Sequence, residues 1–126
     1  MKLILAVAAG GAVGAVARYV TMSAVGMLAG TGFPWSTLAV NVIGSFILGL
    51  LVESMAQFWS PWEALRAFMV VGVLGAFTTF STFSLDVAVL YERGEFAAIA
   101  AYLIASFVLS VGALFTGLAL MRAAFS

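Results

Sequence analysis

Residues 72–84 read GVLGAFTTFSTFS, and this stretch decides the kind of fold that the chain can form. Five of the seven residues from 78 to 84 are Ser or Thr, and two glycines, Gly72 and Gly75, precede them. Hydroxyl side chains offer the backbone alternatives to helical hydrogen bonds, and glycine weakens a helix. We therefore expect a helix that breaks within this stretch. The alternative is an unbroken helix with a packing face rich in Ser and Thr.

The sequence on either side predicts that this stretch lies inside a membrane span. Hydrophobic residues make up 65% of the 126 residues and charged residues only 8%, whereas a soluble domain is about one quarter charged. The uncharged runs cover residues 3–17, 19–52, 67–85 and 96–121. A bilayer core needs about 20 apolar residues per helix, so the run 19–52 is too long for one span.

Clusters of turn residues divide the chain into helices. The segment GTGFP at 30–34 breaks the longest run, and further breaks fall at Ser60-Pro61 and at ERGE, residues 92–95. The prediction is an all-α membrane protein, a single four-helix transmembrane domain over residues 1–126, with the third helix broken at mid-span. The expected spans are about 3–28, 35–58, 63–91 and 95–122.

The charges exclude several classes of function. Five positive and five negative side chains give a net charge of zero, which disfavours nucleic-acid binding. The chain has no Cys and no His, so thiol chemistry, disulfides and histidine acid–base chemistry are absent and an enzyme is disfavoured. Glu53 and Asp86 fall near the ends of predicted spans, so no carboxylate lies at mid-span for proton coupling or a cation pore.

The placement of Lys and Arg bears on how the chain inserts. Lys2, Arg66 and Arg122 would lie on one side of the membrane, and Arg18 and Arg93 on the other. So small a bias permits insertion in both orientations and hence an antiparallel, dual-topology homodimer. The alternative is that features outside this count set a single orientation.

Rows of small residues recur at four-residue spacing, which places them on one helix face. Gly10 and Gly14 form such a row in the first helix and predict close helix packing. This row also favours a membrane helix over a secretory signal peptide, which the first residues resemble. Arg18 continues the row and either reaches the membrane interface or attracts an anion.

Two further rows are polar. The first polar row is Thr37, Asn41 and Ser45, and the second polar row is Tyr102, Ser106 and Ser110. Asn41 either bonds a neighbouring helix or presents its amide to a solute, and the matched rows favour the wall of a polar path. Phe77, Phe80 and Phe83 recur through the broken stretch. They either pack against neighbouring helices or present the positive edges of their rings to an anion. Neutral donors without a cationic trap favour a channel for a small anion.

Three motifs carry a family resemblance: GGAVGAVARY at 10–19, TLAVNVIGSFILG at 37–49 and GVLGAFTTFSTFS at 72–84. The chain resembles the Fluc, or CrcB, fluoride channels over nearly its whole length, with Ala76 as one departure, since many relatives have glycine there. The resemblance implies a fluoride-selective channel that exports fluoride passively from the cytoplasm. It also implies location in the cell (inner or plasma) membrane and an antiparallel homodimer with two pores.

The resemblance also implies roles for individual residues. Phe80 and Phe83 would line the pore with their ring edges toward fluoride, and Asn41 would donate from its amide. A structural sodium ion would be bound at the dimer interface by main-chain carbonyls of Gly75 and Thr78 from both subunits. Arg18 would lie near a water-filled entrance. The polar route would be completed by Ser110 and by Thr37, Ser81, Tyr102 and Ser106.

Two other functions share the size and the span count. A small dual-topology drug exporter would need a membrane-embedded carboxylate, which the first span lacks. A non-transporting assembly subunit would explain Gly10 and Gly14 but not the matched polar rows. Proton-driven cation uptake would support the exporter, and a complete lack of ion flux would support the subunit.

Overall fold

The computed structural model describes residues 1–125, and helix is the only regular secondary structure in that range. The helical elements are α1 (Lys2–Ala29), α2 (Trp35–Gln57), α3 (Glu63–Arg66), the π-helix η1 (Ala67–Leu74), α4 (Gly75–Phe77), α5 (Phe80–Glu92) and α6 (Phe96–Ala124).

Four passages are long and apolar enough to cross a membrane: Lys2–Ala29, Trp35–Gln57, Glu63–Glu92 and Phe96–Ala124. The elements α3 to α5 together form the third passage. Each passage begins and ends within two residues of the range expected from the sequence. The chain is thus all-helical with four candidate spans.

Glycine is required at two of the turns. Gly30 follows α1 with φ 81° and donates its N–H to the Gly26 carbonyl, and Gly94 follows α5 with φ 73°. Other residues rarely adopt a positive φ. Pro34 then precedes the first residue of α2, where its fixed φ suits a helix start.

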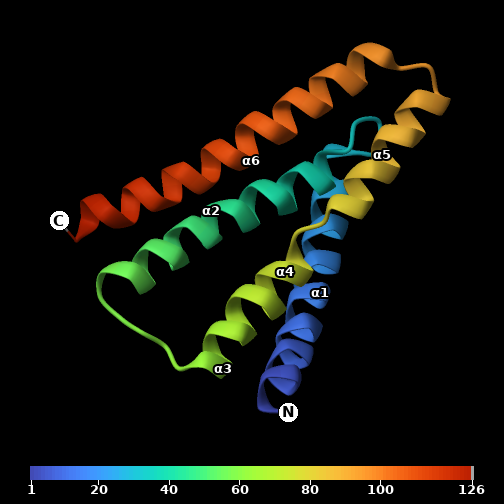
Figure 1. The fold of residues 1–126 in the computed structure, drawn as a ribbon. Coiled ribbons are helices and arrows are strands. Elements are labelled where there is room, and N and C mark those ends of the chain that lie inside the picture. The colour runs from blue at the N-terminus through green and yellow to red at the C-terminus, as the bar shows by residue number, and fades with distance from the viewer. Residues whose placement is uncertain (126) are drawn as a thin grey trace.

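The passages pack as two pairs, and the two members of each pair run in the same direction (Figure 1). In one pair α1 lies beside η1, because a Cβ at Gly10 would meet the Phe68 carbonyl and one at Gly14 would meet the Val73 carbonyl. The close packing predicted from Gly10 and Gly14 is therefore confirmed. In the other pair α2 lies beside α6, and Gly49 and Gly117 allow a similar approach.

The third passage is interrupted between α4 and α5. Thr78 and Thr79 are extended, with ψ of 158° and 123°. The N–H of Thr79 donates to Asn41 Oδ1 at 2.8 Å, and the N–H of Thr82 donates to Thr79 Oγ1 at 3.1 Å. In a continuous helix these two groups would bond to the carbonyls of Gly75 and Thr78. Side-chain oxygens thus replace two helical bonds.

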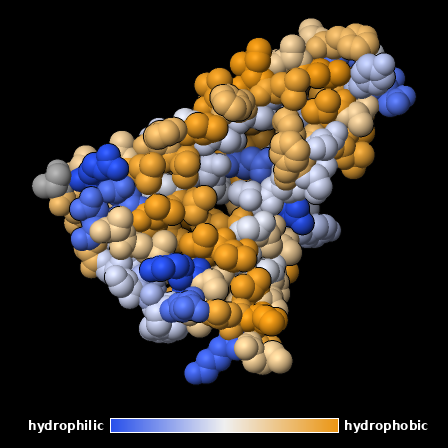
Figure 2. Space-filling model, in the orientation of Figure 1, coloured by the Kyte–Doolittle hydropathy of each residue, from blue (hydrophilic) through white to orange (hydrophobic). Residues whose placement is uncertain are grey.

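Hydrophobic residues cover most of the face shown in Figure 2; hydrophilic ones lie toward the helix ends and in the hollow near its middle. Many large apolar side chains are exposed, among them Ile104, Phe107 and Phe115 on α6. A surface of this kind suits contact with lipid or with another apolar surface.

Candidate functional site

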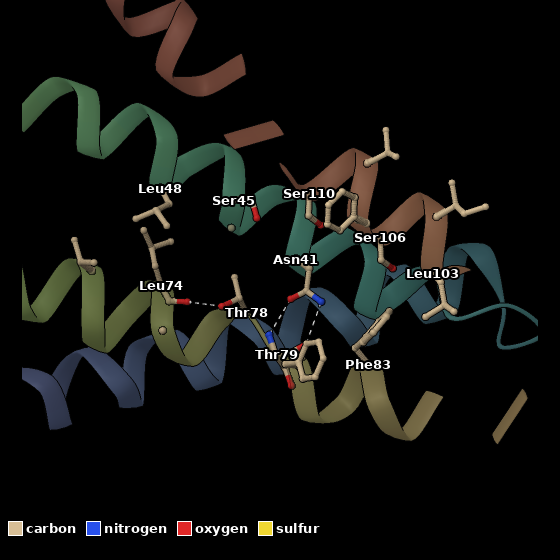
Figure 3. Close-up of a pocket in the computed structure, with 17 residues that line it drawn as sticks. Asn41, Ser45, Leu48, Leu74, Thr78, Thr79, Phe83, Leu103, Ser106 and Ser110 are labelled. Atoms are coloured by element: carbon tan, nitrogen blue, oxygen red, sulfur yellow. Dashed lines mark hydrogen bonds between the residues drawn. The ribbon is translucent and has the colours of Figure 1, made fainter. Parts of the chain in front are cut away.

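A cavity of about 800 Å³ opens between α2, α6 and the interrupted third passage. Figure 3 shows its polar side chains arranged around Asn41. Its lining contains no Asp, Glu, Lys or Arg. The lining residues are Asn41, Gly44, Ser45, Leu48, Val70, Leu74, Gly75, Thr78, Thr79, Phe80, Phe83, Leu103, Ile104, Ser106, Phe107, Val108 and Ser110.

Asn41 joins α2 to the interruption. Its Nδ2 donates to the Thr79 carbonyl at 3.0 Å, and its Oδ1 accepts from the Thr79 N–H at 2.8 Å (Figure 3). The amide therefore satisfies both polar backbone groups of one extended residue. An amide carries two N–H donors, so the second N–H of Asn41 remains for a group in the cavity. Asn41 can therefore bond to a neighbouring segment and also present an N–H to a solute, the two roles that the sequence left open.

The hydroxyls of Ser106 and Ser110 line the same cavity and are buried without a hydrogen-bond partner in the described part of the chain. Elsewhere in α6 the Thr116 hydroxyl donates to the Gly112 carbonyl at 2.7 Å. Such back-bonding is the usual fate of a helical hydroxyl in an apolar setting. Ser106 and Ser110 are thus left as two free hydroxyl groups at a cavity wall.

Two aromatic rings border this wall. The centroids of Phe80 and Phe83 are 5.4 Å apart and their planes are inclined by 40°. Phe80 is 77% exposed, and Phe83 packs 5.0 Å from Tyr102 between ring centroids. Both phenylalanines come from the first turn of α5, so the interruption brings them to the cavity mouth.

Thr37 and Tyr102 lie apart from this cavity, although their rows continue into it. Tyr102 is fully buried, interacts with Thr37 and donates from its hydroxyl to Asp86 Oδ2 at 2.8 Å. Thr37 and Asp86 line a second cavity of about 210 Å³ that also includes Arg93. Each polar row is therefore divided: Thr37 and Tyr102 lie near Asp86, whereas the other members of both rows line the large cavity.

The remaining predicted residues fall in different surroundings. Ser81 is exposed, with its Oγ 3.3 Å from Thr79 Oγ1. Arg18 is half-buried on α1, is not among the lining residues of either cavity, and forms no ion pair within residues 1–125. Gly75 and Thr78 border the large cavity. The N–H groups of Thr79 and Thr82, which would bond to their carbonyls in a continuous helix, donate instead to side-chain oxygens.

Two groups of interacting residues were missed from the sequence. Thr79 is the partner of Asn41, and the 38-residue separation gives no local signal of it. Glu53 pairs with Arg122 through two hydrogen bonds, Nε to Oε1 at 3.2 Å and Nη2 to Oε2 at 3.0 Å. Gln57 also donates to Glu53, and only this spacing of four could have been noticed in the sequence.

Comparison with known proteins identifies the family. Residues 5–118 match the family described as "CrcB-like protein, Camphor Resistance (CrcB)". The chain belongs to the CrcB family. It is 62% identical over 124 residues to the "Fluoride-specific ion channel FluC" of Rhodospirillum centenum, covering 98% of each chain. It is 54% identical over 119 residues to "Fluoride-specific ion channel FluC 1" of Nitrobacter hamburgensis, covering 94% of each.

Family membership and the four apolar passages agree with one another. The chain is a multi-pass protein of the cell membrane, in a family of ion channels rather than enzymes. The resemblance inferred from the three motifs is therefore confirmed.

Proposed function

We propose that this chain forms a fluoride-selective channel that exports fluoride passively from the cytoplasm. The observation that carries the proposal is the large cavity, which offers neutral hydrogen-bond donors and no charged side chain. The names of its CrcB relatives supply the identity of the ion.

The donors in the cavity match the needs of a small anion. Fluoride is strongly hydrated, so a path through an apolar membrane must replace its water with other donors. Ser106 and Ser110 each offer a hydroxyl without a protein partner, and Asn41 offers its second N–H. These groups are uncharged, so they accept the ion without holding it too tightly to release.

Phe80 and Phe83 supply a second kind of contact. The edge of an aromatic ring carries a partial positive charge. Rings presented edge-on at the cavity would stabilise fluoride. Phe80 and Phe83 both line the cavity, with ring centroids 5.4 Å apart, which supports a shared role at one path.

The other predicted positions extend this route. Thr37 and Tyr102 belong to the same polar rows and would extend the route beyond the cavity, and Ser81 would lie beside Phe80 and Phe83. Arg18 would concentrate anions at the water-filled entrance, an effect that salt should screen. The substitution Arg18→Gln should slow fluoride efflux in low salt and have little effect in high salt. An equal effect in both would remove Arg18 from the entrance.

Fluoride release from loaded liposomes tests the function directly. Purified protein should release fluoride rapidly when valinomycin and potassium carry the balancing charge, and chloride should stay inside. Equal release of both ions would contradict the selectivity. Phe80→Ala should slow the release, and an unchanged rate would remove that ring from the pore.

We further propose that the working unit is an antiparallel, dual-topology homodimer with two pores. The near-equal distribution of Lys and Arg and the exposed apolar faces support this assembly. The chain lacks Cys, so a single cysteine placed at the amino terminus can report orientation. An impermeant thiol reagent should label about half of the protein in intact cells; labelling of all or none would exclude dual topology.

Two pores can be counted with a linked dimer. A tandem fusion of two copies, one of which carries a pore-blocking substitution, should keep about half of the flux if each pore acts alone. Complete loss of flux would indicate one shared pathway.

A structural sodium ion fits the donor set at the interruption. The N–H donors to the carbonyls of Gly75 and Thr78 are diverted to side chains, which leaves hard oxygen atoms for a hard cation. Two such carbonyls from each of two copies would give four ligands, and the ion would add positive charge without a charged side chain. Replacing sodium with N-methylglucamine should reduce fluoride flux, and undiminished flux in a sodium-free preparation would contradict the site.

A further inference from the structure

Ser45 belongs to the first polar row, and the family resemblance assigns it no individual role. It follows Asn41 by one helical turn in the first polar row and lines the large cavity, where Figure 3 labels it beside Leu48 and Ser110. Its side chain is half-buried, and its hydroxyl has no hydrogen bond within residues 1–125.

The free hydroxyl of Ser45 contrasts with two hydroxyls of the third passage. Thr78 donates to the Leu74 carbonyl at 3.1 Å, and Ser84 donates to the Phe80 carbonyl at 3.0 Å. Each of these residues satisfies its hydroxyl within its own helix or turn. Ser45 has the Asn41 carbonyl available in the same way and does not bond to it. Its donor is therefore free for a group in the cavity.

The position of Ser45 marks the end of the polar lining. One turn further along α2 the lining residue is Leu48, and across the cavity stand Val70 and Leu74. An ion leaving Asn41 and Ser110 toward this end meets Ser45 as the next donor along α2. Without it, the ion would pass from an amide directly to aliphatic side chains, at the cost of an unpaired charge in an apolar setting.

We propose that the Ser45 hydroxyl donates a hydrogen bond to the permeating fluoride at the apolar end of the cavity. This inference rests on the proposed channel function and adds a position to it. Conduction needs several sites of moderate strength rather than one tight site. Ser45 supplies the step that follows Asn41 and Ser110.

Two substitutions of equal size isolate the hydroxyl. Ser45→Thr keeps the O–H group, and Ser45→Val replaces it with a methyl group. Loss of one neutral hydrogen bond to the ion should slow fluoride efflux from liposomes by about threefold to tenfold in Ser45→Val relative to Ser45→Thr. Ser23, an exposed serine of α1, provides the control, and Ser23→Ala should match the wild type.

The outcomes separate the two proposals. Equal efflux from the threonine and valine variants, with active wild type, overturns the role of Ser45 and leaves the channel function intact. A wild type that releases no fluoride overturns both. If valine at this position prevents purification, Ser45→Ala against Ser45→Gly provides the second pair; each should be slower than wild type by a similar factor, and wild-type rates in both overturn the proposal.

Discussion

The glycine contacts and the hydroxyl-lined cavity arise from the same sequence pattern but give opposite packing, one closed and one open. Both use small residues four positions apart on one helix face. At Gly14 and Gly49 the neighbouring helix closes until a Cβ would meet backbone oxygen, at Val73 and Leu114. Ser106 and Ser110 instead border a cavity, and their hydroxyl oxygens are buried without a hydrogen-bond partner in the described part of the chain. Spacing thus defines a face, and only tertiary structure decides whether that face is closed or open.

Helix α2 takes part in both a close helix contact and the polar site. Gly49 of α2 faces α6, and Asn41 of the same helix faces the interruption of the third passage. The contact fixes α2, and the fixed α2 holds Asn41 against Thr79. The close helix contacts therefore act as a rigid support for the site around Asn41, and substitutions can test the support and the site separately.

The largest effect is expected where the cavity itself depends on a buried bond pair. Asn41→Leu removes both partners of Thr79, a residue only 7% exposed. Each backbone group left unpaired costs about 1–3 kcal/mol, so the variant should be less stable by about 3 kcal/mol. Thermal unfolding in detergent measures the loss.

Asn41→Asp is a companion variant with a different effect on the ion. It keeps the acceptor for the Thr79 N–H but loses the donor to the Thr79 carbonyl and adds a negative charge to the cavity lining. It should lose fluoride flux, because the charge repels the anion, and it should also be less stable than the wild type. If the leucine variant unfolds at the wild-type temperature, Asn41 does not hold the interruption in place.

The second effect tests the closed contact. Gly14→Ala places a Cβ against the Val73 carbonyl. Overpacking of this kind costs about 1–3 kcal/mol, and the displaced third passage should also disturb the cavity. Gly11→Ala is the control, because its Cβ would meet no atom beyond its own stretch of α1 within 4 Å. Equal unfolding temperatures for the two variants would show that α1 does not pack as described.

The fold was accessible from the sequence because its causes are local and repetitive. Uncharged runs give the spans, and Gly30 and Gly94 mark turns that need a positive φ. The partition of the polar rows was not accessible. Tyr102 and Ser106 are one turn apart on one face, yet Tyr102 bonds to Asp86 and Ser106 borders the cavity. That division depends on where α5 crosses α6, which no spacing within either helix records.

The interruption illustrates the same limit. Clustered hydroxyls in residues 78–84 predict that a helix weakens, because such side chains compete for backbone bonds. They do not say which hydroxyl competes. The structure assigns the N-cap to Thr79 and brings Asn41 from another helix to satisfy its backbone.

A third variant separates the second cavity from the first. Tyr102→Phe removes the hydrogen bond to the Asp86 carboxylate, and hydrogen bonds to charged groups contribute about 1.5–3 kcal/mol. The stability loss should fall at the lower end, about 1.5 kcal/mol, because Asp86 also borders a cavity that can hold water. Tyr91→Phe, at an exposed tyrosine, should leave the unfolding temperature unchanged. A loss equal in both would exclude a specific Tyr102–Asp86 bond.

The smallest effect is expected at the far end of the α2–α6 contact. Glu53 is buried and Arg122 is largely exposed, with 64% of its side chain accessible. Glu53→Gln frees the guanidinium, which water can solvate again, and a glutamine amide can still accept a bond there. The unfolding temperature should fall by less than in Tyr102→Phe. The double variant with Arg122→Gln should fall by less than the sum of the single changes, because the two side chains share one interaction. Additive losses would mean that Gly49 and Gly117 hold the two helices together without this pair.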